Sequence, residues 1–121
     1  MTQEDKKLLL IELCARLPYS VKFLRESWNY EWDQEMSVVE VLEDIDKNGF
    51  INNIKVYNVE DIKPYLRPMS SMTEEEEIYY NTIYTTLKFY KKEDWLNAHH
   101  FDYRGLIEKG LALEAPKDMY K

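Results

Sequence analysis

Two prolines, Pro64 and Pro68, stand four residues apart in the middle of the chain and restrict what it can fold into more than any other feature of the sequence. Proline has no backbone N–H, so it cannot donate a hydrogen bond within a helix or a sheet, and it also restricts the residue before it. Residues 63–68 are therefore predicted to be a connector. This connector would divide a β-rich part of the chain from a helical part.

The N-terminal segment has the pattern of an amphipathic helix. Thr2 is a suitable N-cap, and Asp5 stands at the capping-box position three residues later. Apolar residues follow at helical spacing: Leu9, Leu10, Leu13 and Leu17. Pro18 is expected to end the helix. Cys14 lies in the same apolar run and is predicted to be a small buried hydrophobe. As the single cysteine of the sequence, it excludes an intramolecular disulfide.

A small antiparallel sheet is predicted for about residues 21–57. Residues 21–24 are typical of a short strand. The aromatic residues Trp28, Tyr30 and Trp32 alternate with polar residues, as in a half-buried strand.

Residues 36–45 fit either a helix or a strand, because their apolar side chains have helical spacing but many are β-branched. The Asn48-Gly49 pair favours a hairpin, since this dipeptide supplies the positive φ angles of a tight turn. Residues 50–57 alternate as the returning strand would. The sequence therefore predicts strand rather than helix here.

Two or three helices are predicted in the last third of the chain. Thr73 and Glu76 form a capping box at the start of one helix. Its apolar stripe consists of Tyr79, Ile83, Leu87 and Tyr90. A short helix is expected around Trp95, Leu96 and His99. A last helix is expected at residues 103–109, with Asp102 as its N-cap and Gly110 as its C-terminal cap. The predicted class is α+β, in a single domain of residues 1–121.

The charge balance is acidic, with a formal net charge of -7. Residues 21–50 hold three basic and eight acidic side chains, so much of the negative charge of the chain is concentrated in this segment. Direct nucleic-acid binding is not expected, because it depends on lysine and arginine facing phosphates. Charged residues interrupt the N-terminal apolar stretch, which does not resemble a signal peptide or a membrane span. A cytoplasmic protein that does not bind membranes is expected.

The segment that begins at Asp44 resembles the start of a helix–loop–helix calcium site. Asp44, Asp46 and Asn48 occupy loop positions 1, 3 and 5, and Gly49 occupies position 6. Position 12, where a bidentate glutamate closes the shell, is Lys55. A cation there removes two oxygen ligands, so a turn is predicted in preference to a metal site.

A second candidate site consists of His99, His100, Asp102 and Arg104. These residues would suit a metal-assisted or ligand-binding enzyme if their side chains converged in a pocket. However, adjacent residues of a helix point about a hundred degrees apart, so the two histidines cannot easily chelate one ion. A packing or capping role is the preferred interpretation. No nucleophile motif or phosphate-binding loop is present in the sequence, so no catalysis and no cofactor are expected.

Three segments resemble a group of short uncharacterised proteins from gut bacteria, their phages and other mobile elements. The segments are residues 6–18 (KKLLLIELCARLP), 61–76 (DIKPYLRPMSSMTEEE) and 101–116 (FDYRGLIEKGLALEAP). The resemblance implies a compact fold and a mobile-element context. It assigns no role to any residue.

Ten tyrosines, several of them on one predicted helix, exceed what a single buried face can cover, and tyrosine is frequent in protein interfaces. The leading hypothesis is a non-catalytic interaction module that binds a protein partner or a second copy of itself. The candidate contact residues are Glu40, Glu43, Asp44, Asp46, Tyr80 and Tyr84. Two alternatives remain: an inhibitor whose acidic segment mimics nucleic-acid charge, and a small enzyme centred on His99, His100 and Asp102.

Overall fold

The first helix, α1, spans Gln3–Arg16 in the computed structural model, which describes residues 2–29, 34–45, 62–85 and 89–120. Its predicted capping box is confirmed, because the Asp5 N–H donates to Thr2 Oγ1 at 3.0 Å and the Thr2 N–H donates to Asp5 Oδ2 at 3.2 Å. Pro18 lies in the short 3-10 helix η1, Leu17–Tyr19, which ends α1. Capping and periodicity therefore define this element as the sequence predicted.

The buried face of α1 corrects the prediction for Cys14, whose side chain is exposed. Leu9, Glu12, Leu13 and Arg16 form the buried stripe. These positions follow the i, i+3, i+4, i+7 pattern of one helix face, and Cys14 lies outside it. Two of the four are charged, so apolar character alone misplaced the stripe.

Arg16 and Glu12 form a buried ion pair within α1 through Arg16 Nη1 and Glu12 Oε2. Arg16 Nη2 also donates to the backbone oxygen of Phe101 at 2.6 Å. The other Glu12 oxygen, Oε1, lies 2.7 Å from Arg104 Nε. The network joins the first helix to a segment about ninety residues later in the chain, and it satisfies charges that would be costly to bury alone.

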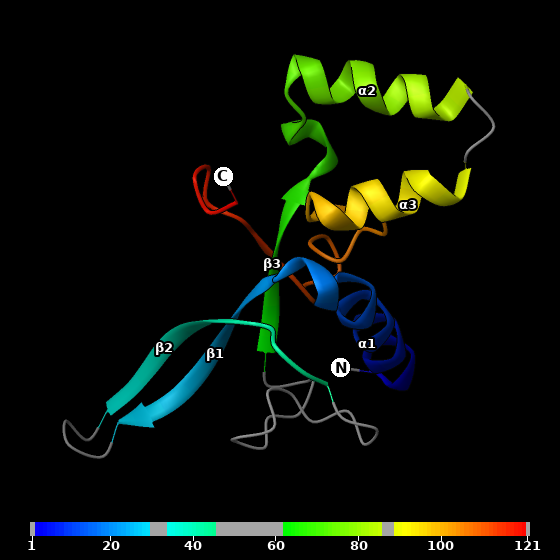
Figure 1. The fold of residues 1–121 in the computed structure, drawn as a ribbon. Helices are drawn as coiled ribbons and strands as arrows, with labels where there is room; N and C mark the ends of the chain where they lie inside the picture. Colours follow the sequence, from blue (N-terminus) through cyan, green and yellow to red (C-terminus); the bar gives the residue numbers. More distant parts are fainter. Residues whose placement is uncertain (1, 30–33, 46–61, 86–88, 121) are drawn as a thin grey trace.

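The sheet is mixed rather than purely antiparallel, and it extends well beyond residues 21–57 (Figure 1). β1, Lys22–Asn29, pairs antiparallel with β2, Gln34–Val41, from Lys22↔Val41 to Asn29↔Gln34. β1 also pairs antiparallel with β3, Ile62–Pro68. Two short strands, β4 at Phe101–Asp102 and β5 at Leu113–Glu114, pair parallel with β3.

β2 confirms that strand is the correct choice over helix for residues 36–41. Its partner is β1, which precedes it in the chain. The predicted Asn48-Gly49 turn and the returning strand at residues 50–57 lie outside the described residues. The same is true of Tyr30 and Trp32.

β3 overturns the prediction of a connector at residues 63–68, because this segment pairs with three other strands. Its ladders are short: three residue pairs with β1 and two each with β4 and β5. The Arg67 N–H donates to the His100 oxygen at 2.7 Å, and the Leu66 oxygen accepts from the Ala115 N–H at 2.8 Å. Neither bond needs an N–H from a proline. A strand that changes partners along its length therefore tolerates prolines that a continuous ladder would exclude.

Two helices follow β3 and form an antiparallel hairpin at one end of the molecule (Figure 1). The 3-10 turn η3, Met69–Ser71, leads into α2, Glu74–Thr85, and α3 spans Phe89–Ala98. The predicted capping box of α2 is confirmed: the Thr73 N–H donates to Glu76 Oε1 at 2.9 Å, and the Glu76 N–H donates to Thr73 Oγ1 at 3.2 Å.

The predicted last helix at residues 103–109 is wrong, since this segment is a series of turns after β4. Asp102 does cap backbone N–H groups, but they belong to Leu106, at 2.8 Å, and Ile107, at 2.9 Å. Gly110 has a φ of +74°, a left-handed conformation that suits the end of the turn. Asp102 and Gly110 therefore act as turn residues at the positions where a helix was expected to start and stop.

One buried apolar cluster receives residues from α1, the sheet and the C-terminal segment. Its members are Leu9, Leu13, Val21, Phe23, Leu42, Ile62, Leu66, Leu106, Leu111 and Ala112. The α+β class, with an N-terminal helix and C-terminal helices, is confirmed. No helix in the described ranges has the length and apolar character needed to cross a membrane.

Glu12→Ala should lower the free energy of unfolding by about 3 kcal/mol, because Arg16 would keep its buried charge without its carboxylate partner. Urea denaturation followed by circular dichroism measures the change. Glu4→Ala is the matched control, since Glu4 is an exposed acid on the same helix, and it should change the value by less than about 0.5 kcal/mol. Equal effects of the two substitutions would contradict the structural role of Glu12.

Candidate functional site

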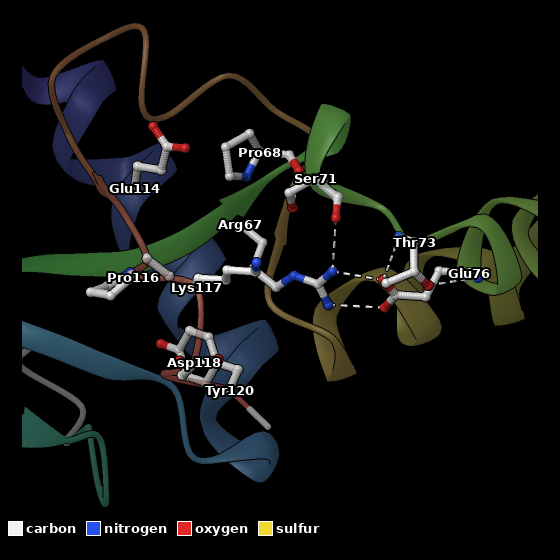
Figure 2. Close-up of a pocket in the computed structure, with 11 residues that line it drawn as sticks. Arg67, Pro68, Ser71, Thr73, Glu76, Glu114, Pro116, Lys117, Asp118 and Tyr120 are labelled. Carbon is white, nitrogen blue, oxygen red and sulfur yellow. Dashed lines mark hydrogen bonds and ion pairs between the residues drawn. The ribbon is translucent and has the colours of Figure 1, made fainter.

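A pocket of about 570 Å³ lies between the end of β3, the start of α2 and the C-terminal segment (Figure 2). Its volume falls in the range of small-molecule sites. Its walls carry side chains of both charges together with prolines and an aromatic ring: Arg67, Pro68, Ser71, Thr73, Glu76, Glu114, Pro116, Lys117, Asp118 and Tyr120.

Arg67 and Glu76 form a two-pronged ion pair in the pocket wall (Figure 2). Arg67 Nη1 donates to Glu76 Oε2 at 2.9 Å and Nη2 donates to Oε1 at 2.7 Å. The guanidinium lies 4.2 Å from the centre of the Phe101 ring, and Nη2 also reaches the Ser71 oxygen at 3.3 Å. Planar guanidinium–carboxylate pairs of this type are among the stronger side-chain hydrogen bonds.

The hydrogen bond from Arg67 lowers the pKa of Glu76 from its ordinary value of 4.5 to about 2, against the opposing effect of burial. The capping-box bond from Thr73 lowers the pKa further. Glu76 is therefore ionised at neutral pH, and both its oxygens bind groups of the protein itself. It is suited to fixing α2 on β3 and not to exchanging protons.

Tyr120 forms the other side of the pocket and joins β1 to β3. Its hydroxyl accepts from the Lys22 N–H at 2.8 Å and donates to the Tyr65 oxygen at 2.7 Å. Burial raises the pKa of Tyr120 to about 12, so the phenol remains protonated and able to donate. Its ring stacks on His100, with 3.8 Å between ring centres.

The four residues of the predicted histidine site are adjacent in sequence but have separate partners. His99 packs on Trp95, with 4.6 Å between ring centres, and its Nδ1 lies 3.6 Å from Glu76 Oε2. The Asp102 carboxylate accepts the two backbone bonds of the turn, and Arg104 binds Glu12. None of the four lines the pocket.

Whereas the ring of His99 packs on Trp95, His100 is buried, its ring stacks on that of Tyr120, and its backbone has a φ of +62°. Its Nδ1 is buried without a hydrogen-bond partner among the described residues. Burial lowers the pKa of His100 to about 4, with the positive charge of Arg16 as a further cause. The imidazole is therefore neutral at physiological pH and acts as a packing group.

The predicted acidic candidates are only partly described. Glu40 lies 3.0 Å from Arg25 Nη2 in a cross-strand ion pair, and Glu43 and Asp44 are exposed just after β2. Asp46 and Asn48 lie outside the described residues. In the part of the chain with described positions, no group of three or more His, Cys, Asp or Glu side chains is arranged to hold a metal ion.

The predicted tyrosine candidates lie on α2. Tyr80 contacts Trp95 at 6.2 Å between ring centres and carries Lys92 Nζ at 4.7 Å from its own ring centre. The side chain of Tyr84 lies outside the described residues. The exposed large apolar residues that precede Tyr80 are Tyr79, which is 52% exposed, and Ile78, which is 62% exposed.

Sequence reasoning missed Arg67, Tyr120 and the burial of Glu12 and Arg16. Arg67 lies in the segment that the prolines marked as a connector, so its ion pair with Glu76 was not predicted. Glu12 and Arg16 stand four residues apart, which is the spacing of a helical ion pair. The residues around Tyr120 in the sequence give no indication of its bridging role, because its hydrogen-bond partners are distant in the chain.

Comparison of the chain with protein-family models, curated proteins and solved structures gives no match. The site is therefore interpreted from its own geometry.

Glu76→Gln should remove a pH-dependent part of the stability. A carboxyl group whose pKa is lowered by folding stabilises the protein above its ordinary pKa of 4.5, and this contribution is lost as the pH falls through about 2. The difference in unfolding free energy between the wild type and Glu76→Gln should therefore shrink from pH 4.5 downward. Urea denaturation over this pH range measures it. Glu77→Gln, at the exposed neighbouring position, should not show this trend. A constant difference for Glu76→Gln would count against the ion pair.

Tyr120→Phe should destabilise the protein by about 1–3 kcal/mol, because the Lys22 N–H and the Tyr65 oxygen lose their shared partner while the ring is retained. Thermal denaturation gives the change. Tyr19→Phe removes a hydroxyl from an exposed tyrosine and serves as the control. A loss no larger than that of the control would show that the bridge contributes nothing.

Proposed function

We propose that this protein is a non-catalytic protein-interaction module that binds through the solvent-facing side of α2. The observation that carries the proposal is the exposure of two adjacent large apolar side chains, Ile78 and Tyr79, on a helix at the end of the molecule. Glu75, Ile78, Tyr79 and Thr82 follow helical spacing and share one face.

This face has the composition of an interface centre with a charged rim. Burial of one large apolar side chain contributes roughly 1.5–3 kcal/mol, and tyrosine adds a polar hydroxyl at the edge of its ring. Three exposed glutamates, Glu74, Glu75 and Glu77, precede the apolar pair in the first turn of the helix and border it on that side. An apolar centre with a polar rim is the usual arrangement of protein interfaces.

The opposite side of α2 is held in place by the rest of the protein. Glu76 binds Arg67 of β3, and Tyr80 contacts Trp95 of α3. Tyr79 also contacts Trp95, at 5.4 Å between ring centres, but remains 52% exposed, so its ring lies at the border between the two sides of α2. The exposed side chains are thus presented on a fixed helix, which reduces the ordering cost of binding.

The two alternative functions receive less support. An enzyme needs groups that converge on a substrate, whereas His99, His100 and Asp102 each contact a different part of the protein. A mimic of nucleic-acid charge needs acids that face solvent together, whereas Glu40 pairs with Arg25. Exposed Glu43 and Asp44 would still contribute to a general acidic surface.

A photo-activated cross-linking amino acid in place of Tyr79 should form covalent adducts with protein in cells that produce the chain. The same amino acid in place of Ile11 is the matched control, because Ile11 is 59% exposed on α1. Gel electrophoresis and mass spectrometry of the tagged protein reveal the adducts. Adducts at position 79 that are absent from position 11 support the proposal. No adduct at position 79, or the same pattern at both positions, would refute it.

A further inference from the structure

We infer that the pocket between β3, α2 and the C-terminal segment binds a short peptide with free amino and carboxyl ends and apolar side chains. This site is separate from the exposed side of α2, so its occupation does not depend on the proposed function. Three charged groups of the pocket wall have no partner among the described residues, and they determine the chemistry of the ligand.

Most other polar groups of the wall already have partners within the protein. Both oxygens of Glu76 and both terminal nitrogens of Arg67 are used in their ion pair. Ser71 Oγ donates to the Pro68 oxygen at 2.7 Å, and the Tyr120 hydroxyl is used in its bridge between β1 and β3. These groups fix the shape of the pocket and are not available to a ligand.

Two donors of positive charge remain on the wall: Arg67 Nε and Lys117 Nζ have no hydrogen-bond partner in the described part of the chain. Arg67 is held by Glu76 and by the ring of Phe101, whose centre lies 4.2 Å away, so its Nε–H has a fixed direction. A fixed guanidinium N–H and an ammonium group on one pocket wall suit a carboxylate, because it accepts charge-assisted hydrogen bonds from both.

A group of opposite charge, the carboxylate of Glu114, lines the same pocket. Its side chain is exposed and has no ion-pair partner among the described residues. In Figure 2 it lies beyond Pro68, away from the Arg67 guanidinium. This carboxylate would repel a simple anion such as phosphate, but it would pair with an ammonium group at the other end of a longer ligand. The pocket therefore suits a ligand with separated charges of both signs.

The uncharged part of the wall consists largely of rings. Tyr120, Pro68 and Pro116 all line the pocket. The Tyr120 ring is fixed by its stacking on His100, and proline rings are rigid by themselves. Such preformed surfaces bind apolar side chains at a small ordering cost. The volume of about 570 Å³ is in the range that holds small organic molecules, so a short apolar peptide with two charged ends matches both the size and the chemistry of the pocket.

NMR chemical-shift mapping of the isotope-labelled full chain tests the inference. The probes are the dipeptides built from leucine and phenylalanine, each at about 5 mM, which exceeds the millimolar Kd of a weak small-molecule site. At least one dipeptide should shift the backbone N–H signals of Arg67, Thr73 and Lys117, while that of Lys7 on α1 stays unchanged. No shift at the three pocket signals with any of these dipeptides overturns the inference.

Blocked peptides test each charged end separately. An N-acetylated dipeptide lacks the ammonium group and a dipeptide amide lacks the carboxylate, so each should bind about tenfold more weakly than the free dipeptide. Equal affinity of the blocked and free dipeptides overturns the assignment of the charged ends. Free leucine and phenylalanine should also bind more weakly, because a single amino acid does not span the two charged regions. Equal affinity of the free amino acids overturns the assignment of a peptide.

Two substitutions connect the ends of the peptide to the wall. Lys117→Gln should weaken the free dipeptide about tenfold and leave the affinity of the dipeptide amide unchanged, because that ligand has no carboxylate for Lys117. Glu114→Gln should weaken the free dipeptide in the same way and leave the N-acetylated dipeptide unchanged. Affinities for the free dipeptide that equal the wild-type value in both variants overturn the inference.

Lys109→Gln and Glu108→Gln are the matched controls, because both residues are exposed and lie outside the pocket. Neither control should change the affinity for the free dipeptide. A loss of affinity in the controls as large as that in Lys117→Gln and Glu114→Gln would reflect net charge alone and would also overturn the inference. Arg67 is left unchanged in these experiments, because its loss would release Glu76 as well.

Discussion

The buried charges of Glu12 and Arg16 are the interaction on which the arrangement of the chain depends. A guanidinium and a carboxylate with almost no exposed surface need hydrogen-bond partners beyond those that α1 alone provides. The missing partners are the Phe101 oxygen and the Arg104 side chain, which come from β4 and the turn after it. The first helix is therefore oriented by the last third of the chain, and the apolar cluster between them is packed around this fixed geometry.

β3 connects this core to the rest of the molecule. Its first residues extend the β1–β2 sheet, its middle pairs with β5, and its last residues pair with β4. Arg67, near its end, holds Glu76 and so anchors the start of α2. The exposed side of α2 is thus linked to the core through β3 and the Arg67–Glu76 ion pair, and also through Trp95 of α3, which contacts Phe101. Of the residues that line the pocket beside Arg67, Ser71, Thr73 and Glu76 take part in this anchoring.

Local signals in the sequence predicted local structure well. Both capping boxes and the strand at residues 36–41 follow from adjacent residues, because their hydrogen bonds span only a few positions. The errors all involve distant partners. Pro64 and Pro68 are tolerated in a strand because three separate segments supply its ladders, and Asp102 begins a turn because β4 is recruited to β3. The prediction that Cys14 is buried was wrong because the apolar pattern of the sequence does not show that the charged residues Glu12 and Arg16 are buried as a pair. The pocket residues Arg67 and Tyr120 depend on the same long-range pairing, so periodicity could not reveal them.

The hydroxyl of Tyr120 has a consequence for the order in which the chain acquires structure. It bridges β1 and β3 at Lys22 and Tyr65, which are separated from it by 98 and 55 residues. While the chain emerges from a ribosome, β1 is made early but cannot complete its contacts until Tyr120 has appeared. In the same way, α1 cannot complete the hydrogen bond from Arg16 until Phe101 has been synthesised. Contacts of such high sequence separation slow folding and make it cooperative, so β1 and α1 complete their native contacts only together with the segment that carries Phe101 and Tyr120.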